Sequence, residues 1–227
     1  MQTELFSPKT EMSILPKTII RVLKSSSFYL LTLCLTFIIS CSDKQQKIVK
    51  GNQPMVILIQ PFKDFKPENV KFVTEEIKKV YPNVKVLDAI DFPSNAYYKE
   101  RNRYRADSII KFLDKRTKEG FVTIGLTSKD ISVTKGKIKD FGIMGLGYRP
   151  GKACVASKFR LNKENQDEQF FKIAIHELGH TQGLKHCPEK MCFMRDAEGK
   201  NPTNEETDFC NKCKTFLINK NWKFNSI

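Results

Sequence analysis

Short apolar runs alternate with helical periodicity in the first part of the chain that has a globular pattern. The runs are flanked by proline, glycine or charged residues, which is typical of strands buried in a sheet. They cover residues 55–59, 84–87 and 121–127. After Pro67, and again over 100–115, apolar positions recur every three or four residues, which predicts a helix in each interval. This order of strand, helix, strand, helix, strand implies right-handed crossovers and a mainly parallel sheet.

After Thr127 the pattern changes to shorter apolar stretches separated by glycines. Two of them, near 143–148 and 153–160, flank the turn sequence YRPG, which predicts an antiparallel hairpin at the edge of the sheet. An edge strand has free backbone donors and acceptors that can pair with an extended peptide. The alternative is an edge covered by other parts of the chain, with no ligand. Cys154 lies in this stretch, and we interpret it as a small core residue.

Apolar positions four residues apart predict a helix with a broad apolar face over 167–182. The chain has only three histidines, and all of them lie in or just after this helix. His176 and His180 are four residues apart, so both imidazoles project from one face and can bind one metal ion. Gly183 lets the helix end and the chain turn back, because glycine adopts positive φ without strain. His186 then becomes available as a third ligand.

The histidines form the complete pattern His-Glu-x-x-His-x-x-Gly-x-x-His. Three protein ligands with an open fourth position are typical of catalytic zinc, whereas closed sites with four ligands are structural. Glu177 follows the first ligand, where a carboxylate can accept a proton from a zinc-bound water as general base. A chance His-Glu-x-x-His on a helix is the alternative, and the complete pattern strongly disfavours it.

Four cysteines follow the third histidine as two pairs with metal-ligand spacing. Cys187 and Cys192 form a C-x4-C pair, and Cys210 and Cys213 form a C-x2-C pair. Four thiolates at these spacings can hold a structural zinc ion tetrahedrally. A secreted location would equally permit two disulfides, in any of three connectivities. Zinc is favoured because a C-x2-C pair is a common metal-binding turn and the other pair adjoins His186.

These motifs resemble the archaemetzincin family within the metzincin clan of zinc peptidases. The resemblance covers roughly residues 55–217 and rests on GIMGLGYRPGKACVASKFRL, HELGHTQGLKHC, PEKMCFM and FCNKC. It implies that the four cysteines bind the family's second zinc ion and that Met194 forms a turn beneath the catalytic metal. Some metzincins have a helper tyrosine soon after this methionine. Here Arg195 and Asp196 follow, so no such helper is assigned, and the segment from Met194 to Cys210 is shorter than the resemblance leads us to expect.

Together these observations predict an α/β (α+β) zincin-like fold with a mixed, mainly parallel twisted sheet and an antiparallel edge strand. An active-site helix and a small zinc-bound C-terminal subdomain complete it. The predicted function is zinc-dependent hydrolysis of peptide bonds in peptide or protein substrates, with Glu177 as general base and two zinc ions per chain. The alternative is a membrane-tethered, zinc-stabilised binding module with little or no hydrolytic activity. Glu177 argues against that alternative, because a pure binding site has no use for a base there.

The N-terminal segment has the pattern of a targeting sequence. An apolar run, Phe28 to Ser40, follows Lys17, Arg21 and Lys24 and is shorter than the about 20 residues that a membrane-spanning helix needs. A run of this length with basic residues before it is typical of a signal peptide. Because the stretch before the apolar run is long for a signal peptide, we expect translation to start at Met1 or at Met12.

The apolar run ends at IISC, which resembles the lipobox of bacterial lipoproteins. In that family the leader is cleaved just before the cysteine, and acyl chains on the cysteine anchor the protein to a membrane. Cys41 is therefore the predicted lipidation site, and the predicted location is the bacterial cell envelope, facing outside the cytoplasm. The alternatives are an ordinary cleaved leader or an uncleaved anchor, with Cys41 incidental in both.

Composition adds limits on domains and partners. A content of 40% hydrophobic residues is typical of a globular chain, and the length suits one domain. The net charge of +14 comes from scattered lysines, so we expect a solvated surface, a monomer and no nucleic-acid partner; an anionic membrane surface or acidic substrates remain compatible. The cysteines lie too close to His186 for an independent nucleic-acid module.

The predicted organisation is a signal peptide (1–40), a polar tether (41–53) and a peptidase domain (54–227). The peptidase domain is divided into an N-terminal subdomain (54–182) and a C-terminal subdomain (183–227).

Overall fold

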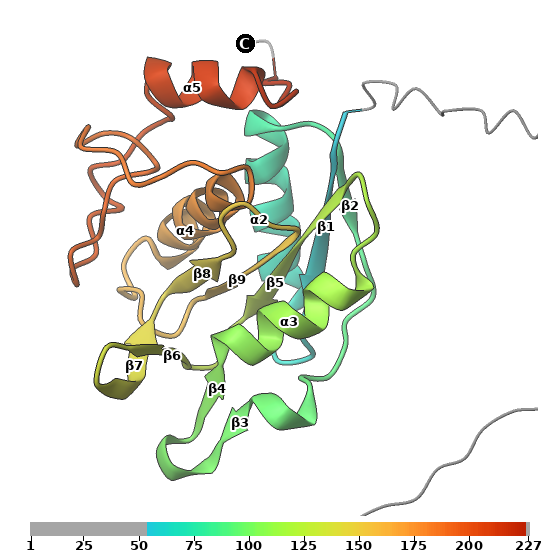
Figure 1. Ribbon diagram of the computed structural model, residues 1–227, viewed down its shortest axis with the longest axis vertical. Coiled ribbons are helices and arrows are strands. Elements are labelled where there is room, and N and C mark those ends of the chain that lie inside the picture. Colours follow the sequence, from blue (N-terminus) through green and yellow to red (C-terminus); the bar gives the residue numbers. More distant parts are fainter. Residues whose placement is uncertain (1–53, 226–227) are drawn as a thin grey trace, which may run out of the picture. The chain divides into compact units, whose positions relative to one another are not determined.

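The computed structural model describes residues 54–225. The predicted signal peptide, the tether and Cys41 lie outside the described residues. Helices and strands alternate through the first part of the described chain (Figure 1). The strands of the main sheet and the helices beside it are β1 (Val56–Pro61), α2 (Pro67–Val80), β2 (Val84–Val86), α3 (Ala106–Arg116), β5 (Phe121–Thr127), β8 (Gly145–Gly147), β9 (Ala153–Ser157) and α4 (Gln166–Thr181).

Five of the strands form one mixed sheet in the order β2-β1-β5-β9-β8. The pairs β2–β1, β1–β5 and β5–β9 are parallel. Only β8 is antiparallel, with Leu146 opposite Val155, and it forms one edge of the sheet, with β2 at the other. The predicted mainly parallel sheet with an antiparallel edge hairpin is therefore confirmed.

Helices cover both faces of this sheet, with α3 on one face and α2 and α4 on the other (Figure 1). The two faces follow from the alternation of side chains along each strand. In β9, Cys154 and Ala156 contact the core under α2 and α4, whereas Ala153 and Val155 contact the core under α3. Cys154 has no exposed surface, so its interpretation as a small core residue agrees with the structure.

Local sequence explains where the helices begin and end. In α2, Pro67 occupies the first turn, where its missing N–H costs nothing. Glu68 lies in the first turn, and Lys78 and Lys79 lie in the last. These charges are opposite in sign to the two ends of the helix dipole and therefore stabilise the helix. The α3 helix repeats this arrangement with Asp107 at its start and Arg116 at its end.

The prediction of a helix beginning at about residue 100 was wrong, because α3 begins at Ala106. The preceding residues form a short 3-10 turn (Lys99–Arg101), a left-handed Asn102 with φ of 49°, and strand β4 (Arg103–Arg105). Residues 103–105 are drawn into a strand because β4 pairs with β6 (Ile131–Lys135), far away in the sequence. Tertiary pairing overrides the local pattern here.

β4 belongs to a second sheet that the sequence pattern did not predict. Its order is β3-β4-β6-β7, with β3 at Tyr97–Tyr98 and β7 at Ile138–Ile143. β3 and β4 have only two and three residues, and charged residues interrupt β4 and β7, so the apolar alternation is weak. Ion pairs of the buried Asp130 with two arginines connect the sheet to the segment after β9. Arg103 Nε lies 2.6 Å from Asp130 Oδ2, and Arg160 Nε lies 2.8 Å from Asp130 Oδ1.

The chain after α4 runs mostly through loops to helix α5 (Asn211–Ile218), which the sequence analysis did not predict. Leu217 and Trp222 are buried in the same apolar core as α2 and α4. The rings of Trp222 and Tyr81 are 4.5 Å apart between centroids, so the C-terminal segment packs directly on the end of α2. None of the helices in 54–225 is long and apolar enough to cross a membrane.

Candidate active site

The three histidines converge at the C-terminal end of α4. His176 and His180 project from this helix, and the chain turns at Gly183, whose φ of 101° belongs to the left-handed region. The returning chain brings His186 to the pair, and one ring nitrogen of each histidine lies within 4.8 Å of the others. The predicted spatial convergence of the three side chains is thus present in the structure.

The second ring nitrogen of each histidine has an oxygen partner. The Nδ1 atom of His176 lies 2.6 Å from the carbonyl oxygen of Phe193, and that of His180 lies 2.8 Å from the carbonyl oxygen of Leu184. The Nδ1 atom of His186 lies 2.9 Å from Asp196 Oδ2. An oxygen acceptor at Nδ1 requires the proton there, which leaves the lone pair of Nε2 free for a metal.

The donor set fits zinc in both distance and charge. The Nε2 atoms of His180 and His186 are 3.2 Å apart. Two nitrogens at zinc's bond length in tetrahedral geometry would be about 3.3 Å apart. Burial lowers the pKa of His176 to about 3, and burial also lowers the pKa of His180, so both imidazoles remain neutral, the form that binds metal.

Glu177 lies against the edge strand β8, and the glycines of that strand make the approach possible. A Cβ atom on Gly145 would lie 2.5 Å from Glu177 Oε1, and one on Gly147 would lie 2.7 Å from the Glu177 carbonyl oxygen. Burial raises the pKa of Glu177 to about 8. Gly145 and Gly147 are positions that the sequence reasoning noted only as part of a glycine-rich hairpin. The sequence feature that could have identified them is the tripeptide GLG directly before the YRPG turn.

Met194 packs beneath α4 in the segment that follows the third histidine. It has no exposed surface, and a Cβ atom on Gly179 would lie 2.5 Å from its Sδ atom. The backbone N–H of Cys187 donates to the carbonyl oxygen of Met194 at 2.7 Å, which joins the returning chain to this turn. Met194 thus supports the helix turn that carries His176 and His180. Its thioether is not one of the groups that zinc prefers as ligands, so its role is packing.

The four cysteines form a second cluster next to the histidines. Their sulfur atoms all lie within 4.8 Å of one another, with Cys187–Cys210 at 3.7 Å and Cys192–Cys213 at 3.8 Å. A disulfide would bring two sulfurs to about 2.05 Å. Four sulfurs bonded tetrahedrally to one zinc ion would be about 3.8 Å apart. The cluster therefore fits a tetrahedral thiolate site, and the backbone N–H of Cys210 donates to Cys192 Sγ at 3.3 Å.

A cleft of about 780 Å³ opens over the histidines. Its floor is α4, with His176, Glu177 and His180. One wall consists of β8 and the hairpin of β6 and β7, and the other wall is the segment 195–206. Charged side chains on these walls are Lys135, Arg149, Arg160, Arg195, Asp196, Glu198, Lys200 and Glu206. The volume of the cleft is in the range typical of ligand sites, and apolar and charged side chains both line it.

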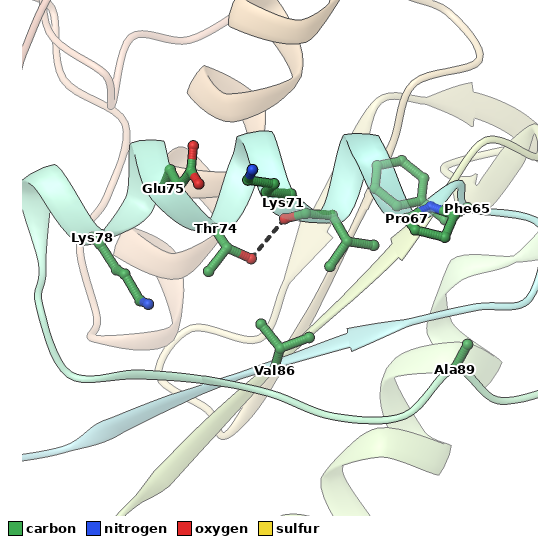
Figure 2. Close-up of a pocket in the computed structure, with 9 residues that line it drawn as sticks. Phe65, Pro67, Lys71, Thr74, Glu75, Lys78, Val86 and Ala89 are labelled. Carbon is green, nitrogen blue, oxygen red and sulfur yellow. Dashed lines mark hydrogen bonds between the residues drawn. The ribbon is translucent and has the colours of Figure 1, made fainter.

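A second hollow, of about 420 Å³, lies between α2 and the chain at β2 (Figure 2). Phe65, Val86 and Ala89 contribute apolar surface to it. The hydroxyl of Thr74 donates to the carbonyl oxygen of Val70 at 2.6 Å, so it is satisfied within the helix. No histidine or cysteine lines this hollow, whereas all three histidines line the cleft.

Comparison with known families matches residues 40–219 to the model described as Peptidase family M54. The chain belongs to this family. The archaemetzincin of Archaeoglobus fulgidus is 33% identical over 164 residues, a match that covers 70% of this chain and 96% of that protein. The crystal structure of that archaemetzincin complexed with malonate covers 71% of this chain and 99% of its own, with 32% identity and a TM-score of 0.62. The archaemetzincin structure from Methanopyrus kandleri gives 28% identity and a TM-score of 0.63, with 76% of this chain and 98% of its own covered.

Membership of the M54 family confirms the archaemetzincin resemblance and the predicted zincin-like α/β fold. The chain is a zinc-dependent metallopeptidase. Its substrates are accordingly peptides or proteins. Of the predicted site residues, those in 54–225 fall into the histidine cluster with Glu177, the cysteine cluster, or the supporting positions Gly183 and Met194.

Proposed function

We propose that His176, His180 and His186 hold the catalytic zinc ion and that Glu177 is the general base. The observation that carries this proposal is the convergence of the three imidazoles, each with its Nδ1 engaged by an oxygen acceptor, beside a buried carboxylate. Bound zinc would supply Lewis acidity that polarises the scissile carbonyl and lowers the pKa of a water molecule. A binding module without hydrolytic activity would have no need for Glu177 at this position.

The chain's own groups would position the substrate and move the proton. Glu177 would accept a proton from the attacking water and later donate it to the leaving amine. Strand β8 pairs with β9 on one side and with no described strand on the other. Its outer backbone groups are available to an extended peptide, which would lie over Gly145 and Gly147 directly above Glu177.

The proposal includes a second zinc ion, held by Cys187, Cys192, Cys210 and Cys213. Four thiolates form a closed site that leaves no position for substrate, so its role would be structural. It would fasten α5 to the turn at Met194, because Cys213 lies in α5 and Cys192 lies two residues before Met194. Both sites draw all of their ligands from one chain, which supports a monomer as the active form.

A peptide-library digest with the wild type and Glu177→Gln side by side tests the catalytic assignment. We expect the variant to keep its fold and zinc content and to lose most turnover, by roughly 10²- to 10⁴-fold. Equal cleavage by a zinc-loaded Glu177→Gln protein would overturn the role of Glu177. The same digest establishes whether cleavage is internal or terminal and which residues flank the scissile bond.

We further propose that the mature protein is attached to a membrane of the bacterial cell envelope through acylated Cys41, outside the cytoplasm. The support is the sequence alone, in which Cys41 directly follows an apolar signal-like run. Cys41→Ser should release the protein from the membrane fraction or block its maturation. Cys34→Ser, in the same leader, is the matched control and should have no effect. Retention of a mature Cys41→Ser protein at wild-type levels would refute the anchor.

A further inference from the structure

One buried acidic side chain in the cleft has no role in the proposed chemistry. Glu206 is 3% exposed and lines the cleft together with Ile173 and Thr203. Ile173 precedes His176 by one turn on the same side of α4. The Glu206 carboxylate therefore belongs to a part of the cleft wall next to the proposed catalytic centre.

Glu206 is held in place by a loop that is bonded to α4. Lys172 donates from Nζ to the carbonyl oxygen of Thr203 at 2.9 Å, and the backbone N–H of Glu206 donates to the same oxygen at 3.3 Å. Asn201 donates to Gln169 Oε1 at 2.6 Å. These contacts place Glu206 in the cleft before any substrate binds, as a specificity residue requires.

The carboxylate of Glu206 has no ion-pair or side-chain hydrogen-bond partner among residues 54–225. The nearest cation on α4, Lys172, is engaged by Glu168 at 2.7 Å and by Thr203. The neighbouring Glu205 is different, because it faces solvent and lies 2.8 Å from Arg195 Nη1. Burial raises the pKa of Glu206 to about 7, against the opposing influence of Lys172 and Arg195. A buried carboxylate without a partner is costly, and a cation supplied by a ligand would remove that cost.

We propose that Glu206 determines specificity by pairing with a basic side chain, lysine or arginine, of the peptide substrate. This inference rests on the proposed peptidase function of the cleft and names a substrate class for it. The aliphatic stem of such a side chain would pack on Ile173 and Pro202, which line the same part of the cleft, while its charged end reaches the carboxylate. Charge-assisted hydrogen bonds in a partly desolvated wall are stronger than exposed ion pairs.

Binding to zinc-loaded Glu177→Gln protein tests the subsite without relying on turnover. The probes are matched peptides in which a single lysine moves through successive positions, each compared with norleucine at that position. We expect one position where lysine tightens binding by on the order of 10- to 100-fold over norleucine. Adding Glu206→Gln should abolish that preference, and adding Glu206→Lys should transfer it to glutamate. Adding Glu205→Gln, the matched control, should leave it unchanged.

A second measurement needs no substitution at Glu206. Carbodiimide coupling should join the peptide lysine to the nearest carboxylate of the protein, and mass spectrometry identifies the residue. Coupling at Glu206 supports the proposal, whereas coupling only at Asp196, Glu198 or Glu205 overturns it. A lysine preference that is absent from the parent protein, or unchanged by Glu206→Gln, also overturns it. If lysine is preferred through Glu206 but the wild type hydrolyses no peptide, the subsite stands and the peptidase assignment fails.

Discussion

The carboxylate of Asp196 lies 2.9 Å from His186 Nδ1, on the side of the ring that faces away from the other two histidines. His176 and His180 use backbone carbonyl oxygens for the same purpose. The backbone N–H of Glu198 donates to Asp196 Oδ1 at 3.0 Å, and this bond lowers the pKa of Asp196. An ionised acceptor therefore orients the one histidine that is not on a helix.

Removal of that acceptor should weaken catalytic zinc binding. Without Asp196, His186 loses the partner that fixes its tautomer and its ring orientation. Asp196→Ala should raise the dissociation constant of the catalytic zinc by about 10- to 100-fold. Competition with a chelator measures this constant, and Glu205→Gln serves as a control from the same loop. Equal zinc affinity in Asp196→Ala and the wild type would show that His186 is oriented by other contacts.

The two metal sites should respond differently to the loss of one ligand. His176→Ala should lower the zinc content from two ions to one while the fold is largely kept, because an open site contributes less to folding than a closed one. Cys213→Ser should lower thermal stability and loosen the C-terminal segment, because α5 depends on the cysteine cluster. Elemental analysis, a thiol count and thermal melts measure these effects. One zinc ion and no free thiols in the denatured, chelated wild type would mean disulfides instead.

A methyl group on Gly145 should reduce turnover through Glu177. The added Cβ would lie 2.5 Å from Glu177 Oε1, so the carboxylate must move away from its position. We expect Gly145→Ala to lower kcat by about 10- to 100-fold with zinc content unchanged, since small misplacements of a reacting group are costly. Steady-state kinetics of Gly145→Ala, Glu177→Gln and the double variant provide the measurement. Full additivity of the two losses would mean that Gly145 acts independently of Glu177.

Glu206 should make stability depend on pH. Its pKa is raised from 4.5 to about 7, so the stability it contributes is present below pH 4.5 and is lost as the pH rises through about 7. Glu206→Gln should therefore raise the melting temperature relative to the wild type more at pH 8 than at pH 5. Lys172 and Arg195 oppose this effect and Glu205 adds to it. Thermal melts of both proteins at both pH values measure this effect. An equal difference in melting temperature between the two proteins at pH 5 and pH 8 would contradict the prediction.

Local sequence was sufficient for the main sheet, the active-site helix and the candidate metal ligands. The strand at 121–127 and the helix around His176 follow from periodicity, because each is stabilised mainly by burial of its own apolar face. The convergence of the three histidines was predictable because the motif lies within one helix and one glycine turn, where spacing in sequence determines spacing in space. The cysteine pairs have the same property, since each pair is local.

Contacts between distant segments could be found only in the tertiary structure. Strand β4 forms because Tyr104 pairs with Ile131, so no local pattern predicts it. Glu206 becomes a buried cleft residue because its loop is bonded to Lys172 on α4, and nothing in the sequence NEET distinguishes it from exposed Glu205. By itself the sequence determined which groups are the candidate metal ligands and which helix carries two of the histidines. The tertiary structure decided which glycines leave space for Glu177 and which carboxylate is buried in the cleft wall. Both depend on the packing of segments far apart in the chain.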